Sequence, residues 1–276
     1  MFEALSFQFF QNALIVAFLA SIAAGIIGTF IVVKRMSMIS GSIAHTAFGG
    51  LGISYFLNTN PLIGGTIFSL VSSISIALFK DKAKNRLDTL LSFLWSTGMA
   101  IGLVFIFMTP GYKTDLFTYL FGNILLVSKI DLLMILILDI IVIITVYLMY
   151  NSILFVVFDE EYAKTKNIPI TLVNAILFGL IALTIVATIK IVGIVLMIAI
   201  LTIPAATAQL FHKTVKKIML TSSLITLFST ISGLFISYYL DFSTGPIIVL
   251  VISTIYLLGI LLSKVKISKR RVKYKN

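Results

Sequence analysis

The chain has 276 residues, of which 59% are hydrophobic and only 11% charged, and its mean hydropathy is +1.13. A water-soluble domain carries about 25% charged residues, so this composition excludes one. A net charge of +11 would suit nucleic-acid binding in a soluble protein. Here the basic residues lie in short segments beside long apolar runs, where they orient a chain against anionic lipid headgroups. We expect membrane lipid around the chain and no nucleic-acid partner.

Nine apolar runs predict membrane-spanning helices, with eight as the alternative count. Each run is close to the ~20 residues that cross ~30 Å of hydrocarbon, and its continuity excludes the alternating strands of a barrel. No room is left for a soluble domain, so residues 1–276 are predicted to form a single all-α polytopic membrane domain. The runs are 9–33, 38–57, 62–79, 89–108, 130–150, 170–189, 191–210, 218–240 and 246–263.

The basic residues alternate across these spans, and 18 of the 21 fall on one side. By the positive-inside rule the rich side is cytoplasmic. Nine spans then place the amino terminus outside and the basic tail, residues 264–276, in the cytoplasm. The rich side holds Lys34, Arg35, Lys80, Lys82, Lys84, Arg86, Lys164, Lys166, Lys213, Lys216, Lys217 and the seven basic residues of the tail, and the other side holds Lys113, Lys129 and Lys190.

The second span, 38–57, is unusually rich in glycine and serine. Ser37, Gly41, His45 and Gly49 recur every four residues and therefore share one helix face. This composition favours a helix that packs against neighbours or lines a polar path over one that faces lipid. A neutral imidazole is a good ligand for zinc and related ions, so His45 is a candidate for the path. A structural histidine, hydrogen-bonded to a serine or a backbone carbonyl, is the alternative.

Asp139 lies near the middle of the fifth span and is the one acidic residue at full membrane depth. A carboxylate is costly to bury in a membrane, which makes Asp139 a functional candidate. The alternative is a protonated or hydrogen-bonded aspartate with a structural role. In the seventh span, Pro204 removes a backbone hydrogen bond and predicts a kink that shapes the path.

The segment 151–169 predicts a short cytoplasmic helix. Asp159, Glu160 and Glu161 precede Tyr162 and Lys164, and acids at the start with a lysine near the end match the helix dipole. Such a helix could rest on the membrane surface as an amphipathic element. Because three acids face anionic headgroups badly, docking on a protein partner is the favoured interpretation.

Seven segments, in order, resemble the permease subunits of ATP-binding-cassette (ABC) importers for divalent metals, the zinc and manganese uptake family. They cover most of the chain between positions 32 and 246. The segments are Val32 to Ser37, Gly41 to Gly52, Asp88 to Gly102, Phe121 to Ser128, Phe158 to Pro169, Val192 to Ala208 and Ser243 to Pro246.

The resemblance implies a homodimeric permease of the type II, vitamin-B12-importer-like fold in a prokaryotic plasma membrane. It implies that an extracytoplasmic binding protein delivers zinc or manganese and that cytoplasmic ATPases use ATP, while the permease itself binds no cofactor. It also implies that 159–168 is the coupling helix that contacts the ATPase. In the family the second span usually reads Asp-x-x-x-His. Here Gly41 replaces the aspartate, and a His45 from each protomer could supply the two ligands.

Other classes of function find less support in the residues. The chain has neither a Walker-type phosphate loop nor an HExxH motif, and it is not expected to be an enzyme. A self-sufficient secondary transporter that uses Asp139 and His45 as a proton or cation relay is the alternative. Such transporters usually contain inverted repeats, and we find no convincing repeat in this sequence.

Overall fold

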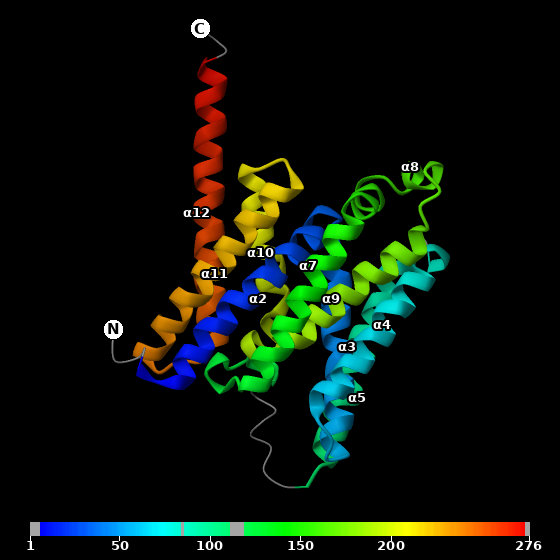
Figure 1. The fold of residues 1–276 in the computed structure, drawn as a ribbon, viewed down its shortest axis with the longest axis vertical. Helices are drawn as coiled ribbons and strands as arrows, with labels where there is room; N and C mark the ends of the chain where they lie inside the picture. The colour runs from blue at the N-terminus through cyan, green and yellow to red at the C-terminus, as the bar shows by residue number, and fades with distance from the viewer. Residues whose placement is uncertain (1–5, 84–85, 111–118, 274–276) are drawn as a thin grey trace.

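The computed structural model describes residues 6–83, 86–110 and 119–273, and in this part of the chain every regular element is a helix. Figure 1 shows the long helices side by side in one bundle. In chain order they are α2 (Gln8–Val33), α3 (Ser37–Phe56), α4 (Pro61–Ala83), α5 (Leu87–Met108), the 3-10 helix η2 (Ile124–Leu126), α7 (Lys129–Phe158), α8 (Glu160–Thr165), α9 (Ile170–Val192), α10 (Ile194–Phe211), α11 (Val215–Leu240) and α12 (Thr244–Lys273).

Each of the nine predicted spans corresponds to one long helix. Eight of the described helices are long and apolar enough to cross a membrane. The ninth, α3, has 20 residues but carries the glycines and serines of the second span. It tolerates this composition because its neighbours enclose it. Helices α7 and α12 run beyond the predicted spans, to Phe158 and Lys273. The predicted basic tail is therefore helical up to Lys273, and residues 274–276 lie outside the described part.

Helix α3 is the inner element of one half of the bundle, and 15 of its residues are buried. It packs mainly against α5 and α4. A Cβ atom added to Gly52 would lie 2.4 Å from the carbonyl oxygen of Gly102, and one added to Gly49 would lie 3.0 Å from that of Gly98. Small residues at these crossings let the two backbones touch, which is how helices associate in lipid.

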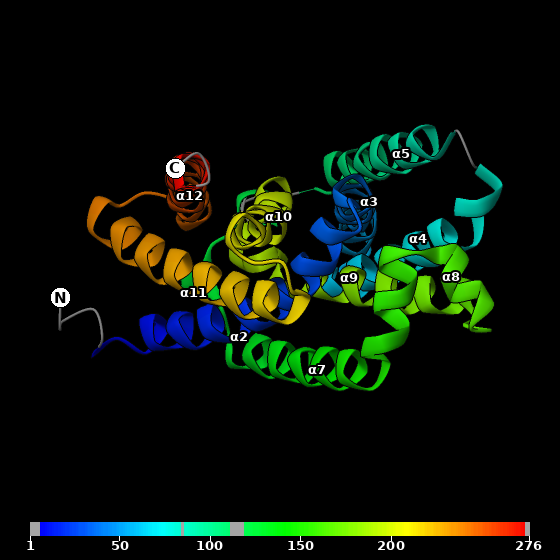
Figure 2. The same ribbon diagram turned by 90° about the horizontal axis from the view of Figure 1, so that it is seen from above.

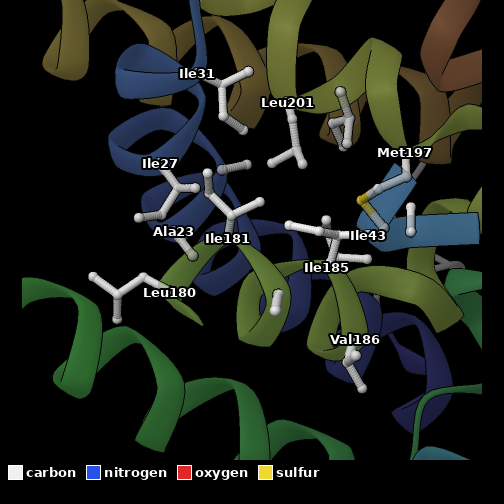
Figure 3. Close-up of a cluster of buried hydrophobic side chains, with 14 of the residues drawn as sticks. Ala23, Ile27, Ile31, Ile43, Leu180, Ile181, Ile185, Val186, Met197 and Leu201 are labelled. Carbon is white, nitrogen blue, oxygen red and sulfur yellow. The ribbon is translucent and has the colours of Figure 1, made fainter. Parts of the chain in front are cut away.

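The main core lies where α2, α3, α9 and α10 meet (Figure 3). Helix α2 contributes Ala23, Ile27 and Ile31, all fully buried or nearly so. Opposite them lie Ile43 of α3, Leu180, Ile181, Ile185 and Val186 of α9, and Met197 and Leu201 of α10. Helix α10 packs against α2, and α9 packs against α3. The view from above shows α9 beside α3 (Figure 2). Helices that are widely separated in sequence are thereby fixed to one another.

The loops sort to two ends of this bundle. At one end the Lys34 ammonium donates a hydrogen bond of 2.7 Å to the Asn174 amide oxygen, joining the end of α2 to the start of α9. At the other end the Ile124 amide donates a hydrogen bond of 3.2 Å to the Thr244 hydroxyl, joining η2 to the start of α12. Gly193, between α9 and α10, has φ +80° and lies at the same end as η2. A Cβ atom added to it would lie 2.3 Å from the carbonyl oxygen of Leu120. The alternation predicted from the basic residues agrees with this arrangement.

Candidate translocation path and coupling helix

His45 stacks on Trp95. The two ring centroids are 3.9 Å apart and the planes differ by 17°. His45, on α3, is only 8% exposed, and its Nδ1 atom is buried without a hydrogen-bond partner. In the described structure, Nδ1 does not make the hydrogen bond to a serine or a carbonyl that the structural alternative expects, and both interpretations of His45 stay predictions. The imidazole of His45 therefore contacts an aromatic side chain from a different helix, α5.

The position of Trp95 depends on Gly41. A Cβ atom built on Gly41 would lie 2.5 Å from Cζ3 of Trp95 and 2.9 Å from Cδ1 of Ile198. The indole therefore occupies the space that a side chain at position 41 would need. No signal in the sequence joins Gly41 to Trp95, because 54 positions separate them. That Trp95 is the single tryptophan of the chain is the one hint that the sequence offers.

Asp139 lies on the inner face of α7, where it is 2% exposed, and neither carboxyl oxygen makes a well-aligned hydrogen bond in the described structure. The backbone of Ala23 in α2 is the polar group that lies beside the carboxyl. Among the described helices, α2 and α9 pack against both α3 and α7, whereas α3 and α7 share no substantial packing. The structure therefore does not bring Asp139 and His45 together.

No cluster of three or more His, Cys, Asp or Glu side chains that could hold a metal is found among the described residues. His45 and Asp139 are separate buried groups on α3 and α7. A tight, resident metal site within one protomer has no support from this geometry.

The predicted short helix is present as α8, which covers Glu160–Thr165 and is shorter than the predicted 159–168. Asp159 is its N-cap, and Oδ1 of Asp159 accepts a hydrogen bond of 3.0 Å from the Tyr162 amide. Glu161 and Lys164 form an exposed ion pair of 2.7 Å along the helix. Tyr162 is 44% exposed and packs against Phe155 of α7. These residues present α8 at the surface of the end that also holds Lys34.

Glu160 differs from its neighbours, because it points back into the bundle. Its Oε1 atom lies 2.9 Å from Nζ of Lys34, and Lys80 donates to the same oxygen. Partial burial of Glu160 opposes ionisation, but the hydrogen bonds and charges of Lys80 and Lys34 outweigh it and hold the pKa of this carboxyl below its usual value. Since Lys34 also binds Asn174, one carboxylate connects α8 with α2, α4 and α9.

Residues 6–263 match the model of the ABC 3 transport family. The chain belongs to this family. It is 41% identical over 260 residues to the uncharacterised membrane protein slr2045 of Synechocystis, covering 94% of this chain and 92% of that protein. It is 33% identical to the manganese import system permease protein ScaB of Streptococcus gordonii, covering 97% and 96% of the two chains.

A solved structure gives the same result for the fold. PsaBC from Streptococcus pneumoniae, in complex with Fab, superposes with a TM-score of 0.86 at 31% identity, covering 98% of this chain and 96% of that one. The protein is thus an ABC transporter permease with the importer fold predicted from sequence, and it is not an enzyme.

Within this ABC 3 permease, the remaining predicted residues lie at helix contacts. Pro204 is buried inside α10, which continues as one helix from Ile194 to Phe211. Gly49 contacts Gly98 of α5. Sequence reasoning missed Trp95, Lys34, Lys80 and Asn174 as partners of the candidate residues. Each of these contacts joins different helices, and no local pattern marks such pairs.

Proposed function

We propose that this permease is the membrane subunit of an ATP-driven importer of a divalent metal ion, with manganese ahead of zinc. The observation that carries the proposal is the similarity to ScaB, a manganese import permease, over nearly the full length of both chains. A cytoplasmic ATP-binding-cassette ATPase would supply the energy, and an extracytoplasmic binding protein would deliver the ion. The permease would act as a homodimer.

The end of the bundle that carries α8 faces the cytoplasm in this proposal. Lys34, Lys80 and α8 meet at that end through Glu160, and the sequence places most basic residues in the same set of loops. The positive-inside rule supports this orientation. The amino terminus and η2 would then lie on the extracytoplasmic side.

Helix α8 would be the contact with the ATPase. Some of its residues would bind the ATPase, and Glu160 would connect α8 to the other helices. Glu161 and Tyr162 are exposed and available to a partner. Glu160 is directed inward and would pass movement of α8 to α2 and α4 through Lys34 and Lys80, and to α9 through Asn174. A short helix that is held by ion pairs at its base moves together with the helices to which it is tied.

His45 would line the path as a transient ligand. A path must bind an ion well enough to admit it and weakly enough to release it, and one imidazole per protomer meets this condition. The second ligand would come from His45 of the other protomer. The relay of a secondary transporter lacks support, because Asp139 and His45 lie on helices that do not pack together.

The test is uptake by reconstituted vesicles that contain the permease, its ATPase and its binding protein. Manganese uptake that requires ATP and stops with a hydrolysis-deficient ATPase is the expected result. Zinc is measured in parallel, because uptake of zinc in preference to manganese would reverse the assigned order of the ions. Uptake without the ATPase, driven by a proton or sodium gradient, would contradict the proposal.

A further inference from the structure

Residues of two helices, α3 and α10, contact the half-buried Trp95 side chain. The imidazole of His45, on α3, covers one face of the indole at a centroid distance of 3.9 Å. The six-membered ring of the indole sits over Gly41, one turn before His45, with Ile198 of α10 at the same place. Stacked rings at this distance are in van der Waals contact, and such pairs are stabilising beyond their buried area.

This arrangement holds His45 in a state that is unfavourable for the imidazole itself. Nδ1 is buried and has no hydrogen-bond partner. A buried polar atom without a partner costs free energy, so the contact with Trp95 must contribute to keeping the ring where it is. Metal-binding histidines are usually oriented by a hydrogen bond to their second nitrogen. At His45 no such bond is present at Nδ1, and a stacking partner takes its place.

Because Gly41 has no side chain, it leaves a space on α3, here called the notch, which the Trp95 indole fills. The stacking of Trp95 on His45 depends on this space. Any side chain at position 41 would bring a Cβ atom to 2.5 Å from Cζ3 of the indole, which is closer than real Cβ contacts. A carboxylate at position 41 and the indole in this position therefore exclude each other. The glycine at position 41 has a physical counterpart in this chain, which is the ring of Trp95.

We propose that Trp95 is the positioning residue of the ion path: its indole, seated in the notch at Gly41, clamps the His45 imidazole and releases it when a divalent metal ion binds. The inference rests on the proposed function, because it assigns the ion to the same path. In the clamped state the imidazole is held with Nδ1 enclosed. Coordination of an ion satisfies a ring nitrogen and compensates for loss of the stack.

The permease carries its own reporter for this event, because Trp95 is its only tryptophan. Intrinsic fluorescence of the full-length permease in lipid vesicles that contain no other protein is measured while Mn²⁺ or Zn²⁺ is added. We expect a saturable change in Trp95 emission with the transported ion. Mg²⁺, which prefers oxygen ligands, serves as the control ion and should produce no change. Zn²⁺ is informative because it is not paramagnetic, so its effect reports movement of the ring rather than direct quenching.

Variants separate clamping from ligation. His45→Phe keeps an aromatic ring against Trp95 but removes the nitrogens, and it should abolish the response to metal. Gly41→Ala changes neither ring, but its Cβ atom forces the indole to move. The emission of Trp95 should therefore shift to the red, and transport should fall several-fold. Gly179→Ala is the matched control, since a Cβ atom there meets nothing within 4 Å. It should retain wild-type emission and uptake.

The outcomes distinguish this inference from the proposed function. If the wild-type complex takes up the metal but Trp95 emission does not respond, the clamp is wrong while the importer stands. The same holds if Gly41→Ala keeps both emission and uptake. If the wild-type complex takes up no divalent metal, the proposed function itself fails. The wild-type titration requires no variant, so a Gly41→Ala protein that does not fold leaves the test intact.

Discussion

Nζ of Lys34 lies 2.9 Å from Oε1 of Glu160, which joins the end of α2 to the first residue of α8. The Lys34 side chain is only 8% exposed, whereas Glu160 is 30% exposed. The pair is therefore more enclosed than the Glu161–Lys164 pair on the same helix, whose side chains are 83% and 61% exposed. Two adjacent glutamates of α8 thus point in different directions, Glu160 toward the bundle and Glu161 toward the surface.

Glu160→Gln is expected to uncouple ATP hydrolysis from transport. The change removes the charge that holds Lys34 and Lys80, so α8 is no longer tied firmly to α2 and α4. Hydrogen bonds to charged groups contribute about 1.5–3 kcal/mol, and the permease should lose stability within that range. ATPase activity and metal uptake of the reconstituted complex are measured together. Hydrolysis should persist while uptake falls several-fold.

Glu161→Gln is the matched control, because this exposed pair contributes ~1 kcal/mol at most. It should leave permease stability nearly unchanged. Equal loss of coupling in the Glu161 and Glu160 variants would show that charge on α8, and not the contact with Lys34, matters. Wild-type coupling in Glu160→Gln would contradict the proposed transmission.

The stability contributed by Glu160 should depend on pH. Its pKa is lower in the folded protein than in the unfolded chain. Its contribution is therefore fully present above the ordinary pKa of a glutamate and disappears as the pH falls through the lowered folded value. The difference in thermal midpoint between wild type and Glu160→Gln is measured in detergent from neutral to acidic pH. It should be constant near neutrality and shrink only at acidic pH, and a difference that grows on acidification would refute the assignment.

His45→Ala should reduce uptake sharply while dimer formation and ATPase binding persist. The path would lose its ligand, and the side chain makes no hydrogen bond through Nδ1 that the fold would miss. Uptake is measured over a range of metal concentrations, together with size-exclusion chromatography of the complex. Normal uptake at every concentration would make His45 a structural residue.

Gly52→Ala should weaken the contact between α3 and α5. The added Cβ atom would meet backbone, the Gly102 carbonyl at 2.4 Å, and backbone cannot rotate away. Overpacking of this kind costs about 1–3 kcal/mol, which a thermal unfolding assay in detergent should detect. Gly179→Ala provides the comparison and should have little effect. Equal midpoints for the two variants would show that the helices adjust without cost.

Single cysteines can test the orientation, because the natural chain contains none. Cysteines at Asn60 and Asp241 should react with an impermeant thiol reagent from outside the cell. Cysteines at Lys82 and Lys213 should react only after the membrane is opened. Labelling of Lys82→Cys in intact cells would invert the topology and move α8 away from any cytoplasmic ATPase.

The sequence by itself determined the class of protein, the helical segments and the alternation of the loops. These depend on local properties: the length of apolar runs, the positions of lysine and arginine, and the acids that begin α8. It also marked α3 as unlike the other spans, because glycine and serine lower its affinity for lipid.

The tertiary structure decided where the individual polar residues lie and what they contact. From sequence, Glu160 belonged with Glu161 as a docking residue, yet it turns inward to Lys34 and Lys80. Asp139 and His45 both lie in spans, yet they are on helices that do not pack together. Trp95 fills the space left by Gly41. Each of these relationships joins helices far apart in the chain, and which faces meet is set by the packing of the whole bundle rather than by any local pattern.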